Sequence, residues 1–80
     1  MNLWNLKPSQ HGVISGFAET MDEIINTRLQ ELGFSPGHPV KCIMQPSFGA
    51  PRVYQVHQSV YSLDKEVAEN INVDLIEGTV

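Results

Sequence analysis

The sequence contains one cysteine and no long apolar run, and both features limit what the protein can be. A single cysteine, Cys42, excludes an internal disulfide framework, and a free thiol fits a reducing cytoplasm. No run of about 20 apolar residues that could span a bilayer occurs, and the N-terminus carries no signal-peptide pattern. We therefore expect a cytoplasmic protein that does not insert directly into a membrane.

Basic residues are also scarce. Five lysines and arginines stand against nine acidic residues, which gives a net charge of −4 at pH 7. Most of the excess acid follows Leu63, at Asp64, Glu66, Glu69, Asp74 and Glu77. No basic stripe is available to neutralise phosphates, so we do not expect nucleic acid as a direct partner.

The sequence lacks the usual motifs of catalysis and of metal or phosphate binding. Neither GxGxxG nor GxxxxGK[ST] occurs, and Cys42 has no neighbouring base that would activate a nucleophile. His38 and Cys42 would lie roughly 13 Å apart on a strand, too far to share an ion, and His11 and His57 stand alone. We therefore expect no enzyme, no cofactor and no metal site.

The clearest structural signal runs from Arg28 to Gly37 and continues into a strand at 40–45. An apolar stripe typical of one helix face precedes it, at Met21, Ile24, Ile25, Leu29 and Leu32. Thr20 and Glu23 have the spacing of a capping box, which predicts the helix start at Thr20. Gly33 predicts the helix end, and residues 35–38 (Ser-Pro-Gly-His) predict a type II turn.

The remaining elements are short. Strands are predicted at 12–17, 52–57, 60–63 and 71–75, and a short helix at 63–71 with Ser62 or Asp64 as its cap. Two prolines in the 46–51 loop exclude a central strand there, and residues 76–80 are expected to fray. We expect one domain over residues 1–80. It should be mostly β, an SH3-like small β-barrel without exposed sheet edges, with one helix inserted after the first strand and a short helix before the last.

Several short motifs resemble the FeoA family of small proteins associated with bacterial ferrous iron uptake. They span nearly the whole chain: Leu6-Lys7-Pro8, Arg28-Leu29, Glu31-Leu32-Gly33, Pro36-Gly37, Pro46, Gly49, Pro51, Leu63, Glu66, Ala68, Ile71 and Val73. The resemblance implies a non-enzymatic accessory protein that binds and modulates FeoB, a membrane iron transporter with a cytoplasmic GTPase domain. It also implies an alternative, because a related SH3-like module occurs in metal-dependent repressors: a stand-alone divalent-metal-sensing domain.

The predicted partner-binding residues are Arg28, Phe48, Gly49 and Arg52. We expect the interface at the 46–51 loop and the neighbouring helix surface. The ring of Phe48 is either an exposed anchor or is tucked under the barrel, and Arg28 is either a contact or a helix-surface cation. Tyr54 and Tyr61 are expected to face each other across a hairpin. An open barrel edge could pair weakly with a second copy.

Overall fold

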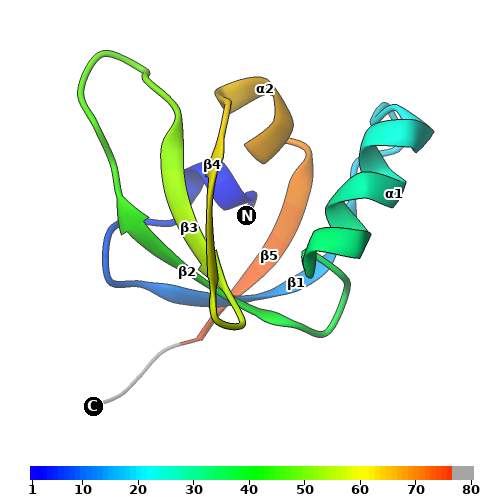
Figure 1. Ribbon diagram of the computed structural model, residues 1–80, viewed down its shortest axis with the longest axis horizontal. Helices are drawn as coiled ribbons and strands as arrows, with labels where there is room; N and C mark the ends of the chain where they lie inside the picture. The colour runs from blue at the N-terminus through cyan, green and yellow to red at the C-terminus, as the bar shows by residue number, and fades with distance from the viewer. Residues whose placement is uncertain (77–80) are drawn as a thin grey trace.

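The computed structural model describes residues 1–76 (Figure 1). In chain order the elements are a 3-10 helix η1 (Leu3–Asn5), β1 (His11–Phe17), α1 (Glu23–Leu32), β2 (Pro39–Met44), β3 (Arg52–Val56), β4 (Ser59–Leu63), α2 (Lys65–Ala68) and β5 (Ile71–Ile76). All five strands and both helices predicted from the sequence are present, and η1 is an additional element. Within the described residues, no helix is long and apolar enough to cross a membrane.

The five strands form one antiparallel sheet in the order β4-β3-β2-β1-β5. The mostly β, SH3-like architecture is thus confirmed, but the expectation that the barrel leaves no exposed edge was wrong. The sheet is open, with β4 and β5 at its edges and the short helix α2 in the connection between these two strands (Figure 1).

The core lies on the inner face of this curved sheet. It consists of Leu3, Leu6, Ile14, Leu29, Phe34, Val40, Cys42, Tyr54, Val56, Leu63, Ala68, Ile71 and Val73. In β2 the buried positions alternate, so Val40 and Cys42 point inward while Ile43 is exposed. The strand is therefore buried on one face and open on the other.

The start of α1 differs from the prediction. Asp22, not Thr20, is the N-cap, and its Oδ1 accepts a hydrogen bond of 2.8 Å from the amide of Ile24. The chain is still turning before that point, because the amide of Met21 donates to the carbonyl of Ala18. Asp22 is the first capable side chain after this turn, and its negative charge suits the helix N-terminus.

The end of α1 follows the prediction closely. Gly33 adopts φ = 113°, and the amides of Gly33 and Phe34 donate to the carbonyls of Gln30 and Leu29 in the pattern of a Schellman motif. The next turn is closed by a 3.0 Å bond from the His38 amide to the Ser35 carbonyl, with Gly37 at φ = 91°. Together these turns direct the chain from α1 into β2.

The β3–β4 hairpin pairs Tyr54 with Tyr61, as expected. Its two-residue connection is His57-Gln58, and His57 takes the left-handed conformation at φ = 57° that glycine or asparagine usually supplies. At the other end of the chain, Ile76 belongs to β5, so the expected fraying from residue 76 was wrong there. Residues 77–80 lie outside the described part of the chain.

Candidate functional site

The loop between β2 and β3 presents an exposed aromatic ring. Phe48 is 105% exposed and sits in a left-handed turn with φ = 62°, followed by Gly49 with φ = 71°. Of the two interpretations that the sequence left open, the structure supports the exposed ring. A phenylalanine fully in water is available as an anchor for another molecule.

Arg52, another predicted interface residue, contacts the N-terminal segment. Its Nη1 donates to the carbonyl oxygen of Trp4, and its guanidinium carbon lies 3.8 Å from the centroid of the Trp4 ring. This cation–π contact ties β3 to η1 and leaves Arg52 half-buried. A role for Arg52 in partner binding stays a prediction, but the side chain has a structural contact of its own.

A second apolar surface lies along α1. We call it the α1 groove, a hollow of about 340 Å³ lined by Ile24, Ile25, Arg28, Leu29, Leu32, Leu63 and Val67. Ile24 is 76% exposed and Ile25 is 42% exposed, whereas Leu29 is buried. The apolar stripe on the helix is therefore wider than the part that the core covers. Arg28 is exposed at this groove.

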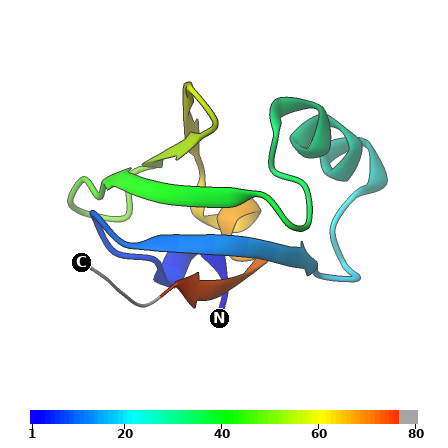
Figure 2. The ribbon, with the colours of Figure 1, turned by 90° about the horizontal axis from the view of Figure 1, so that it is seen from below.

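The two surfaces lie at opposite ends of the molecule. In Figures 1 and 2, α1 lies at one end of the long axis and the loop between β2 and β3 lies at the other. Arg28 and Phe48 therefore do not form one small patch. The loop and the helix surface, which the sequence suggested as one interface, are separate candidates.

Cys42 and Tyr54, which pair across β2 and β3, are buried groups whose pKa values are raised. Burial raises the pKa of the Cys42 thiol, an effect that the charge of Arg52 partly opposes. Burial, reinforced by Cys42, raises the pKa of Tyr54 to about 12, and its hydroxyl donates to the carbonyl of Leu3 at 3.3 Å. Both groups stay protonated at neutral pH and belong to the core.

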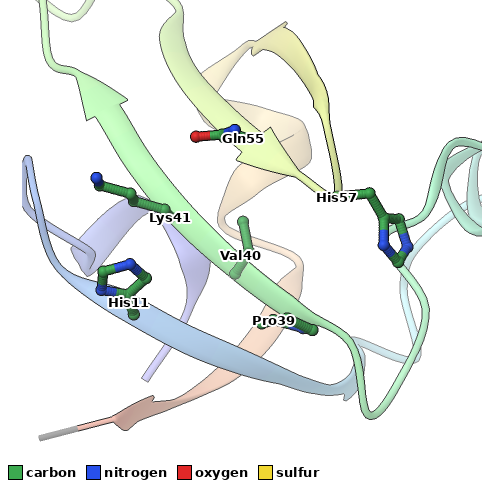
Figure 3. A pocket seen from close by; sticks show the side chains of 6 residues that line it. All are labelled: His11, Pro39, Val40, Lys41, Gln55 and His57. Carbon is green, nitrogen blue, oxygen red and sulfur yellow. The ribbon is translucent and has the colours of Figure 1, made fainter.

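The histidines are arranged differently from the expectation that His11 and His57 stand alone. His11 and His57 lie at opposite ends of a hollow of about 210 Å³ and do not converge (Figure 3). Nε2 of His57, however, lies 3.2 Å from Nδ1 of His38. The register that pairs Lys41 with Gln55 brings the start of β2 beside the end of β3. Only knowledge of this pairing could have revealed the contact, because the two histidines are 19 positions apart.

Among residues 1–76, no group of three or more histidine, cysteine, aspartate or glutamate side chains could hold a metal ion. The pair of His38 and His57 brings together two ligating side chains.

Sequence and structure comparisons show which known proteins this chain is similar to. The sequence profile of the FeoA domain matches residues 1–75. The crystal structure of FeoA from Stenotrophomonas maltophilia complexed with zinc is 29% identical, with a TM-score of 0.81 over 92% of this chain and 89% of that one. It is described as a procaryotic SH3 domain protein and a candidate ferrous iron transport activating factor. No curated protein matched the chain.

More distant structures share the fold alone. FeoA from Chlorobium tepidum is 22% identical, with a TM-score of 0.88 over all of this chain and 74% of that one. A manganese-dependent transcriptional repressor is 14% identical, with a TM-score of 0.82 over 95% of this chain and 41% of the repressor. The profile match over nearly the full length decides the assignment, and the chain belongs to the FeoA domain family.

Proposed function

We propose that this protein is a cytoplasmic, non-enzymatic accessory protein of ferrous iron uptake, which binds a FeoB-type membrane transporter and modulates it. Membership of the FeoA domain family supports the link to iron transport. The description of the Stenotrophomonas protein as a candidate activating factor supports an accessory role. The acidic surface beyond Leu63 favours contact with a protein over contact with an anionic lipid surface.

The observation that carries the proposal is the exposure of Phe48. Burying a phenylalanine side chain contributes about 1.5–3 kcal/mol, and within this chain Phe48 gains none of that. Its backbone is held in a left-handed turn, so the ring is presented on a defined loop. A partner with an apolar pocket would gain the burial on binding.

The α1 groove offers a second contact for the same partner. Ile24 and Ile25 present apolar surface beside the Arg28 cation, and Leu63 and Val67 form the opposite wall. A large membrane protein can reach both ends of a molecule whose longest extent is 36 Å. Binding at both ends would give the transporter control over the orientation of the bound protein.

Two measurements in the native host test this function. We expect the tagged chain to co-purify with the FeoB-type transporter from detergent-solubilised membranes, and deletion of its gene to reduce ferrous iron uptake. A plasmid copy should restore uptake. Absence of the transporter from the purified complex, together with normal uptake in the deletion strain, would contradict the proposal.

A further inference from the structure

Two consecutive turns at the end of α1 meet a third turn that is distant in the sequence. They are the helix stop at Gly33, the turn that ends at His38, and the hairpin turn at His57. A Cβ atom at Gly33 would lie 2.8 Å from Cδ2 of His57 and 2.8 Å from Cγ1 of Val56, so the helix end packs directly against the hairpin. The imidazole of His57 is therefore held beside the helix end by a close contact with backbone.

The two imidazole rings meet edge to face. Their centroids are 4.9 Å apart with an interplanar angle of 75°, and Nδ1 of His38 lies 3.2 Å from Nε2 of His57. The same Nδ1 lies 3.2 Å from the carbonyl oxygen of Gly33. Nδ1 of His38 thus has two polar neighbours and carries at most one proton, so at most one of the two can accept a hydrogen bond from it.

The nitrogen separation also suits a shared metal ion. Zinc binds imidazole nitrogen at about 2.0–2.1 Å in tetrahedral geometry, which places two such nitrogens about 3.3 Å apart. The pair in this protein therefore has the spacing of two ligands of one ion. An ion bound by both nitrogens would replace the hydrogen bond between the two rings.

We propose that His38 and His57 form a binding site for a divalent first-row transition-metal ion, with Nδ1 of His38 and Nε2 of His57 as the two protein ligands. Neutral imidazole favours copper, nickel and zinc over manganese, and it does not suit magnesium, which requires oxygen ligands. This proposal replaces the expectation from the sequence that the chain holds no metal.

The site is open to solvent on the side of His57, which is exposed, while His38 is half-buried. With two side-chain ligands, the remaining coordination positions fall to water or to a donor from another molecule. An open coordination sphere of this kind differs from a closed structural zinc site. We therefore infer an exchangeable ion whose affinity is modest.

Titration calorimetry with zinc chloride alone tests the site, and the chain supplies its own control. We expect one zinc ion per chain for the wild type and for His11→Gln, because His11 is exposed and remote from the pair. His38→Gln and His57→Gln should each weaken binding by at least about tenfold, since loss of an outer-shell partner alone costs about 10–100-fold. Magnesium chloride should give no binding.

A second measurement uses the wild-type protein and so does not depend on the folding of any variant. Zinc added during NMR detection of the histidine side chains should shift the ring resonances of His38 and His57 and leave those of His11 unchanged. The proposal is overturned if millimolar zinc gives neither heat nor shifts. It is also overturned if binding persists in both variants of the pair or is lost in His11→Gln.

Discussion

At the scale of single residues, Gly33 has the least room for a side chain of the glycines that the structure describes. It combines φ = 113° with a Cβ position that is 2.8 Å from both His57 and Val56. Glycine is the only residue that avoids both the backbone strain and the steric clash. The glycine that ends the helix is therefore also the point at which α1 packs against the hairpin.

We predict that Gly33→Ala lowers the free energy of unfolding by about 2 kcal/mol or more, because strain and overpacking add. Gly37→Ala separates the two effects. That position has φ = 91° but open space, so the loss should be about 1 kcal/mol from strain alone. Gly16→Ala, with no contact within 4 Å and no left-handed backbone, should change stability by less than about 0.5 kcal/mol. Urea unfolding of the three variants checks this order, and equal losses would contradict it.

Tyr54 makes the free energy of unfolding depend on pH in the alkaline range. Burial raises the pKa of Tyr54 in the folded protein to about 12, above its ordinary value of 10.0. The stabilisation that comes from the protonated Tyr54 hydroxyl is therefore complete below about pH 10 and is lost as the pH rises through about 12. The free energy of unfolding falls by up to about 3 kcal/mol over this range. Urea midpoints measured from pH 8 to pH 12 should fall less steeply for Tyr54→Phe than for the wild type. Parallel curves for the two proteins would show that Tyr54 has no such effect.

At the scale of elements, turns and caps decide where each helix and strand begins. Gly33 and Gly37 made the end of α1 predictable, because each requires a backbone conformation that few other residues adopt. The start of α1 was less predictable, because Thr20 and Asp22 are both competent caps. Only the turn at Ala18–Met21 selects between them.

The capping residue can be tested directly. Asp22→Ala should lower the free energy of unfolding by about 1 kcal/mol, because the Ile24 amide loses its acceptor and the helix N-terminus loses a negative charge. Thr20→Ala is the matched control and should be nearly neutral. Chemical denaturation of both variants gives the comparison. A larger loss of unfolding free energy for Thr20→Ala than for Asp22→Ala would instead support Thr20 as the cap, as the capping box predicted from the sequence has it.

Contacts between elements were the part that the sequence could not supply. The pairing of β2 with β3 brings His38 to His57, and the fold places Arg52 on the ring of Trp4. Neither contact leaves a local pattern, because each joins turns or strands far apart in the chain. The open sheet was missed for the same reason, since local strand signals do not show whether β4 and β5 pair. Pairing of either edge with a second copy stays a prediction.

At the scale of the whole molecule, the protein has apolar surface at both ends of its long axis. The loop with Phe48 lies at one end and the α1 groove with Ile24 at the other (Figure 2). The fold brings the groove together from α1, β4 and α2, whereas the loop depends on its own short turn. The two ends can therefore be altered independently, without disturbing the core between them.

The affinity of the purified chain for the cytoplasmic GTPase domain of its FeoB-type transporter tests the central claim most directly. Phe48→Ala and Ile24→Ala each remove an exposed side chain, so both variants should keep the thermal midpoint of the wild type. Val60→Ala, at a 56% exposed apolar residue on β4, is the control. We predict measurable binding by the wild type and by Val60→Ala, and a loss of at least about tenfold for Phe48→Ala. A comparable loss for Ile24→Ala would add the α1 groove to the interface. No binding by the wild type, or full binding by Phe48→Ala, would contradict the account.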